Sequence, residues 1–264
     1  QKGYGTGASV SNANAQTYIN FNGGTLALTS GGAVVRKSGT APDPSLTVYE
    51  GGAVIDANTH NLTLDYPLAA PSGTGVASIS VSNPGSGYIA PPFVLISGGG
   101  GTGAVAVAML DTVPGKISGF RILCPGTGYT SAPTVTLGGG GFIVPASGAI
   151  ALLGPVATSG GLALSGSGTL PLAAANTYRG ATAVTNASLV LAPSGSITTN
   201  SALILDNASF SAPGRDLTNA VLRVSGDSTL VANSLTAAAL DKTGAGTLNL
   251  YARLALTTNA PTAV

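Results

Sequence analysis

Two aspartates flank the only histidine of the chain, and these residues are the first place to look for chemistry. Asp56, His60 and Asp65 follow one another within a short stretch. They could form an acid–base pair or a small metal site, because both need carboxylate and imidazole groups at short range. β-Helix enzymes that act on polysaccharides need such carboxylates on neighbouring rungs. We expect the simpler alternative, in which these side chains belong to a turn around Asn58 and Asn61.

The rest of the chain offers little for other catalytic or metal centres. A serine hydrolase needs a histidine base in support, and Ser86 and Ser167 each lie between two glycines that we interpret as turn residues. A zinc site needs several Cys or His ligands, but the chain has one of each. We expect the one cysteine, Cys124, to be a small buried apolar residue. The sequence therefore predicts no enzyme activity, no catalytic residue, no metal site and no cofactor.

Three tyrosines follow turn sequences and are the best candidates for contact with a ligand. Tyr88, Tyr129 and Tyr178 stand at turn ends that look equivalent. A tyrosine in such a position can cap a core while its hydroxyl meets solvent or backbone, or it can stack on a carbohydrate. We expect the packing role and keep glycan stacking as the alternative.

Composition excludes several classes of partner. Charged residues make up 7% of the chain and the formal net charge is +1, against roughly 25% charged residues in an average globular domain. Without a basic patch, nucleic acid is a poor partner. No run of about 18 apolar residues occurs, so we expect no transmembrane helix and no membrane insertion by this chain. A nearly uncharged surface of Ser, Thr, Asn and Gly favours association between copies.

Alternation of polar and apolar residues is the dominant local pattern. A period of two is typical of strands with one buried face. Clusters of Gly, Pro, Asn and Ser separate these runs, and no segment is long enough and capped well enough to form a stable helix. The clearest alternating runs are residues 25–28, 45–48, 61–64, 134–137, 188–191, 202–205, 222–224 and 247–250.

One segment of the chain is duplicated. Residues 79–88 and 120–129 each predict a strand, a Pro-Gly turn and a tyrosine, and a second strand follows at 92–96 and 133–137. Both copies then run into four glycines. Glycine adopts positive φ at no steric cost. We interpret four glycines of the duplicated turns as turn-defining: Gly85, Gly87, Gly126 and Gly128.

A second motif, Gly-x-Gly-Thr-Leu, occurs twice in the later part of the chain. Its second glycine is Gly168 in one copy and Gly246 in the other, and we interpret both as turn-defining. The repeats divide the chain into three zones. We assign residues 1–70 to the first part of a β-solenoid, 71–141 to the duplicated β module, and 142–264 to a β-solenoid with repeats.

The stretch from Gly168 to Leu191 resembles the autotransporter-associated beta-strand repeat. That family reads roughly Gly-Thr-Leu-x-Leu, then Asn-Thr-Tyr-x-Gly-x-Thr-x-Val. The matching residues are Asn176, Thr177, Tyr178, Gly180, Thr182 and Val184. The chain departs from the pattern at Asn186-Ala187, where the family has Gly, and residues 242–248 are similar only to the opening of the family pattern.

The resemblance implies a right-handed parallel β-helix on the outside of a bacterial cell. Elementary physics agrees, because stacked coils roughly 4.8 Å apart bury a continuous aliphatic core that a single short strand cannot bury. Asn at the turns tolerates the left-handed conformation. We therefore predict an all-β protein, a right-handed parallel β-helix with a small β module inserted around residues 71–141.

These observations favour an extracellular structural protein that assembles with itself, head to tail, into a fibre, sheath or surface layer. The alternative is an adhesin whose module at 71–141 binds cell-surface glycans. A polysaccharide-active enzyme is the least favoured function. Since the chain begins with Gln1 and shows no signal peptide, we expect a processed chain or a fragment.

Overall fold

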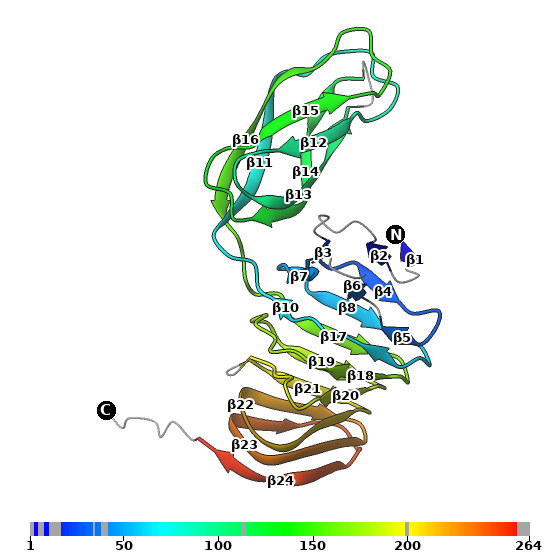
Figure 1. Ribbon diagram of the computed structural model, residues 1–264, viewed down its shortest axis with the longest axis vertical. Helices are drawn as coiled ribbons and strands as arrows, with labels where there is room; N and C mark the ends of the chain where they lie inside the picture. Colours follow the sequence, from blue (N-terminus) through cyan, green and yellow to red (C-terminus); the bar gives the residue numbers. More distant parts are fainter. Residues whose placement is uncertain are drawn as a thin grey trace, which may run out of the picture. The chain divides into compact units, whose positions relative to one another are not determined.

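The computed structural model describes residues 3–4, 8–10, 17–33, 35–37, 42–111, 115–198 and 201–257, and every regular element within them is a strand (Figure 1). The chain divides into two compact units. One combines residues 1–70 with 158–264, and the other runs from Pro71 to Ala157. The predicted absence of helices is confirmed for the residues that the structure describes.

The first unit is a β-solenoid in which all strand pairs are parallel. Its first ladder has the order β1-β4-β8-β17-β19-β21-β22, and a second ladder has the order β18-β20-β22-β23-β24. The strands are β1 (Gly3–Tyr4), β2 (Ala8–Val10), β3 (Tyr18–Phe21), β4 (Thr25–Ala27), β5 (Gly32–Ala33), β6 (Val35–Lys37), β7 (Ser45–Val48), β8 (Ala53–Asp56), β9 (Leu62–Thr63), β10 (Leu68–Ala69), β17 (Leu162–Ser165), β18 (Thr169–Leu172), β19 (Thr182–Thr185), β20 (Ser188–Leu191), β21 (Leu203–Asp206), β22 (Ser209–Ser225), β23 (Ser228–Lys242) and β24 (Leu248–Leu256).

Successive coils of the solenoid have nearly equal lengths. The register partners Leu162, Thr182, Leu203 and Leu222 mark one coil each and follow one another at almost even intervals along the chain. The period of two then places every second side chain in the interior.

Interior side chains form continuous columns from coil to coil. One column is formed by Ile55, Leu164, Val184, Leu205 and Val224, and a second by Leu170, Leu189, Phe210 and Leu230. All of these side chains are buried. The predicted parallel β-solenoid with an aliphatic core is therefore confirmed.

A corner after the first ladder repeats from coil to coil in the left-handed conformation. Asn186 and Asn207 have φ of 54° and 48°, and Gly226 takes the same place one coil later with φ of 60°. Asparagine is the side chain that tolerates this conformation best after glycine. The departure from the family pattern at Asn186 therefore keeps the turn geometry that glycine would give.

The second unit is inserted between two coils without breaking the ladder. Strand β8 pairs directly with β17, so Ile55 lies beside Leu164 although the whole inserted unit separates them in the chain. The strands of this unit are β11 (Thr74–Asn83), β12 (Phe93–Ser97), β13 (Thr102–Leu110), β14 (Ile117–Thr127), β15 (Thr134–Gly138) and β16 (Ser147–Pro155). Because β11 pairs with β16, the compact unit runs to Ala157 and includes a strand that the sequence analysis placed in the third zone.

The two halves of the inserted unit are related by its internal duplication. Strands β11-β16-β15-β12 form an antiparallel sheet, and β13 pairs with β14. Strands β12 and β15 are the two copies of one repeated strand, and they pair with each other. At the centre of this pair Leu95 lies opposite Thr136, its own equivalent in the second copy. The pair therefore marks a local two-fold relation between the copies.

Truncation of an interior side chain tests the solenoid core. Leu205 is fully buried between Val184 and Val224. We expect Leu205→Ala to lower the free energy of unfolding by about 3 kcal/mol, since it removes buried methyl groups and leaves a cavity between two coils. Denaturant unfolding followed by circular dichroism measures the loss.

The matched control is Ile204→Ala, which truncates the neighbouring side chain on the outer, half-buried face. We expect it to cost about 1 kcal/mol or less. Equal losses for the two variants would contradict the assignment of inner and outer faces.

Candidate functional site

The structure places Asp56, His60 and Asn61 in one turn between β8 and β9. The carboxylate of Asp56 accepts a hydrogen bond from the backbone N–H of Asn58 at 2.9 Å, as turn aspartates do. The backbone N–H of His60 donates to the carbonyl of Ala57 at 2.8 Å. The side chain of Asn61 accepts from the N–H of Thr169 on the next coil at 3.0 Å. These contacts are those of a turn that also ties two coils together.

Carboxylates on the first ladder are too far apart to act as a pair. Going from coil to coil, Asp56 is followed by Ser165, Thr185 and then Asp206. Three coil steps of about 4.8 Å put the two carboxylates about 14 Å apart, while an inverting glycosidase needs about 6.5–9.5 Å. Asp65 is exposed. No group of three or more His, Cys, Asp or Glu side chains in the described part of the chain is placed to hold a metal ion.

The duplicated tyrosines occupy equivalent buried positions in the inserted unit. Tyr88 is 7% exposed and Tyr129 is 5% exposed. The hydroxyl of Tyr88 accepts a hydrogen bond from the N–H of Ala146 at 2.8 Å, and the backbone of Ala104 bonds the hydroxyl of Tyr129 in the same way. Burial raises the pKa of Tyr129 above its ordinary value. Rings in these positions pack the core and present no free face for stacking on a sugar.

Glycines form the walls around each of these two rings. A Cβ added to Gly126 would lie 2.5 Å from the carbonyl oxygen of Thr102 and 2.8 Å from the ring of Tyr129, and Gly126 also has φ of 70°. Gly85 has the same relation to the ring of Tyr88. A second glycine packs against each ring at another ring carbon, and these are Gly99 for Tyr129 and Gly140 for Tyr88. The glycine runs at 98–101 and 138–141 are the only sequence signal for this second pair, and nothing within the runs marks Gly99 or Gly140.

The other turn-defining glycines divide into two kinds. Gly87 and Gly128 have positive φ, as predicted for turn residues. Gly168 and Gly246 do not need positive φ, because their role is close approach between coils. A Cβ on Gly168 would lie 1.9 Å from the carbonyl oxygen of His60, and one on Gly246 would lie 2.0 Å from backbone of Gly226. These two glycines let the backbone of one coil pass directly over the next.

Tyr178 differs from the other two tyrosines because it lies inside the solenoid. Its side chain is fully buried, and its hydroxyl is 2.7 Å from the hydroxyl of Thr182, which is buried as well. Burial raises the pKa of Tyr178 far above its ordinary value, and the hydrogen bond with Thr182 offsets only part of this effect. This ring fills the core, so the expected similarity to the turn ends of Tyr88 and Tyr129 is not observed.

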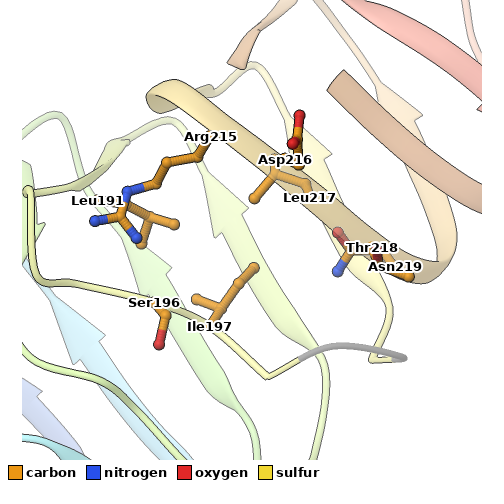
Figure 2. Close-up of a pocket in the computed structure, with 8 residues that line it drawn as sticks. All are labelled: Leu191, Ser196, Ile197, Arg215, Asp216, Leu217, Thr218 and Asn219. Carbon is orange, nitrogen blue, oxygen red and sulfur yellow. The ribbon is translucent and has the colours of Figure 1, made fainter. Parts of the chain in front are cut away.

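One pocket lies at a corner between two coils, and it was not visible in the sequence. Its volume is about 250 Å³, which is below the range of about 300–1,000 Å³ that is usual for small-molecule sites. Figure 2 shows Ile197 and Leu217 pointing toward the same space, with Arg215 extended toward Leu191. The residues that line the pocket are Leu191, Ser196, Ile197, Arg215, Asp216, Leu217, Thr218 and Asn219.

The charged groups at this pocket are already engaged in contacts between coils. The guanidinium of Arg215 donates to the backbone carbonyls of Ala192, Pro193 and Gly195. The carboxylate of Asp216 accepts from Ser234 at 2.6 Å and from Asn233 at 2.7 Å, and these bonds hold the pKa of Asp216 below its ordinary value. These two charged side chains therefore act as ties between coils.

One buried acceptor at the pocket has no hydrogen bond. Asn219 is 3% exposed, and its amide nitrogen donates to the carbonyl of Ser201 at 3.0 Å. Its amide oxygen has no hydrogen-bond partner among the described residues. This oxygen is itself buried, so it is not open to a molecule in the pocket. The residues that line the pocket include no nucleophile paired with a base.

Comparison with known families identifies one part of the solenoid. Residues 162–191 match the family model of the passenger-associated transport repeat. The resemblance to autotransporter passengers is thereby confirmed for this segment, and such a repeat indicates a passenger segment with a surface or secreted location. No curated protein and no solved structure matches the chain. Among the described residues, no helix has the length and apolar character needed to span a membrane.

The geometry gives the asparagine of this repeat a structural role. The matched residues comprise β17 to β20, in which β17 pairs with β19 and β18 with β20. Asn176 is buried between coils, where its side chain accepts from the N–H of Leu68 at 2.8 Å and donates to the carbonyl of Ser196 at 2.7 Å. The asparagine thus binds the coil before it and the coil after it.

Paired glycine substitutions test the walls around Tyr129. Gly126 and Gly128 both have positive φ, but only Gly126 faces the ring and backbone, while a Cβ on Gly128 would meet nothing within 4 Å. We expect Gly128→Ala to cost about 1 kcal/mol of backbone strain. Gly126→Ala should cost about 3 kcal/mol, because overpacking adds to the same strain.

Denaturant unfolding gives both free energies, and near-ultraviolet circular dichroism reports the packing of the tyrosines. A Gly126→Ala variant as stable as Gly128→Ala, with an unchanged tyrosine signal, would show that this ring is not held as described.

Proposed function

We propose that the chain is a structural β-solenoid of a bacterial surface that extends by coil-on-coil stacking with further copies, head to tail. It acts by building a continuous fibre or layer, and it carries out no reaction. The passenger-associated repeat supports the surface location. The engagement of corner side chains such as Arg215, Asp216 and Asn176 in ties between coils supports a structural role.

The observation that carries this proposal is the uncovered interior at β24. Leu254 and Leu256 lie in register with Leu235 and Ala237, which are 0% and 1% exposed. They are themselves 37% and 48% exposed, because no described coil lies beyond β24. Side chains in interior positions that remain exposed at a coil edge form a template for another parallel coil.

A first coil from another copy would complete this edge. Such a coil would extend the hydrogen-bonded ladder and the aliphatic columns. These are the two kinds of interaction that join neighbouring coils within the solenoid. Net charge near zero lowers the repulsion between such copies. An exposed coil edge associates for the same reason that an edge strand does.

Electron microscopy and sedimentation velocity of the purified chain test head-to-tail assembly. We expect filaments or rows whose length increases with protein concentration. Leu254→Lys combined with Leu256→Lys should abolish them, since a coil stacked on β24 would have to bury two unpaired charges.

The matched control is Asn249→Lys, which adds a charge to an exposed outward position of the same strand and should leave the assemblies intact. Dispersed monomers of the unmodified chain at every concentration would contradict the proposal, as would filaments of the double lysine variant.

A further inference from the structure

Exposed apolar side chains are concentrated in the inserted unit. Of the fifteen large hydrophobic side chains that are exposed among the described residues, eleven lie between Pro71 and Ala157. The others are Tyr18 and three residues of β24. Between β3 and β24, the described coils of the solenoid have no exposed large hydrophobic side chain. An additional contact surface is therefore to be sought in the inserted unit.

The outer face of the four-stranded sheet carries four of these side chains. Phe93 and Leu95 on β12 are 64% and 54% exposed, and Ile150 and Leu152 on β16 are 64% and 65% exposed. Their neighbours along each strand point inward and pack on the core of the unit. The sheet therefore has a second, uncovered apolar face.

The large residues of this face lie on two alternate strands, Ile150 and Leu152 on β16 and Phe93 and Leu95 on β12, and the two pairs lie at different levels along the strands. In the sheet order β11-β16-β15-β12, the register row Ser80, Ile150, Thr134 and Ser97 crosses all four strands. Strands β16 and β12 form apolar ridges. Strands β11 and β15 form grooves of small side chains, and these groove residues are Ser78, Ser80, Ser82, Thr134 and Thr136.

This alternation makes the face complementary to itself. A two-fold axis that lies between two stacked sheets, along the strands, reverses the lateral order of the second sheet. Strand β12 then faces β11 of the second copy, and β16 faces β15, so each ridge meets a groove. Such self-complementarity is what an isologous contact requires, and aligned face-to-face stacking is the usual way in which two sheets pack.

Charge does not oppose this contact. The inserted unit has three charged residues in its whole sequence, Asp111, Lys116 and Arg121, and none of them lies on the four strands of this sheet. No ion is desolvated when the faces meet, and the groove hydroxyls can exchange their hydrogen bonds with water for bonds across the contact.

We propose that the outer face of the β11-β16-β15-β12 sheet binds the same face of a second copy, as a symmetric sheet-on-sheet dimer. This contact is distinct from the end-to-end stacking at β24. Four side chains with rows of hydroxyls offer on the order of 600 Å² per copy. This is below the ~800 Å² of a standard interface, so we expect a weak dimer that forms reversibly with protein concentration.

The internal duplication supplies natural replacements for the apolar pair on β12. Strand β15 is the copy of β12, and it carries Thr134 and Thr136 at the positions of Phe93 and Leu95. Phe93→Thr with Leu95→Thr therefore gives one copy the residues that the other copy already has. This variant should fold and lose one ridge of the contact.

Sedimentation equilibrium of the full chain tests the dimer, in a background of Leu254→Lys and Leu256→Lys that removes stacking at β24. We expect a monomer–dimer equilibrium in this background and a dissociation constant at least tenfold higher after Phe93→Thr and Leu95→Thr. Val105→Thr with Met109→Thr, on exposed positions of β13 outside this sheet, is the matched control and should leave the constant unchanged.

Cross-linking locates the contact independently of stability. Residue 134 lies near the proposed axis. In a Cys124→Ser background, we therefore expect a short bismaleimide to cross-link two copies of the Thr134→Cys variant, but not two copies of the Met109→Cys variant. A chain that stays monomeric in the β24 background would overturn the proposal, whatever happens to filaments of the unmodified chain. Loss of the dimer only in the β13 variant, or cross-linking only through residue 109, would overturn it as well.

Discussion

The solenoid depends on the hydrogen bonds that each coil makes with the next along a parallel ladder. This ladder fixes the coil spacing, and it requires successive coils of nearly equal length, as the steps from Leu162 to Thr182 and Leu203 show. At corners the backbones approach so closely that a Cβ is excluded, which accounts for Gly168 and Gly246. Where a corner is left-handed, only Asn or Gly fits without strain.

The same constraint engages several polar side chains in contacts between coils. Each of four side chains accepts a hydrogen bond from the backbone of an adjacent coil, and these are Asn61, Asn176, Asn207 and Asp227. Arg215 and Asp216 are engaged in the same way around the pocket of Figure 2. A side chain that already holds two coils together cannot take a substrate without weakening the fold. These contacts favour the structural role that we propose for the chain.

Much of the fold could be predicted because its signals are local. Period-two alternation predicted strands such as β20 and β21, and the internal duplication predicted the two equivalent tyrosines, Tyr88 and Tyr129. The Gly-x-Gly-Thr-Leu motif was less accurate, because it aligns Thr169 with Thr247, whereas the ladder brings Thr169 into register with Asn249. A shift of two positions leaves the inner and outer faces unchanged, so the motif still indicated the correct faces.

Features that depend on long-range contacts could not be predicted. The extent of the inserted unit is set by the pairing of β11 with β16, which no local pattern announces. Close approach at Gly168 and the burial of Tyr178 result from coils that are adjacent in space and distant in sequence. The pocket with Asn219 and the ridge-and-groove face around Ile150 likewise arise only when separate strands are brought side by side.

The register of neighbouring coils is the most direct test of this account. Ala163, Ala183 and Ile204 are outward-facing register partners on three successive coils. In a Cys124→Ser background, paired cysteines at 163 and 183 should form a disulfide on mild oxidation, because coils about 4.8 Å apart suit its geometry. A pair at 163 and 204, two coils apart and about 10 Å distant, should not form one. Oxidation of the second pair, with none of the first, would contradict this coil order.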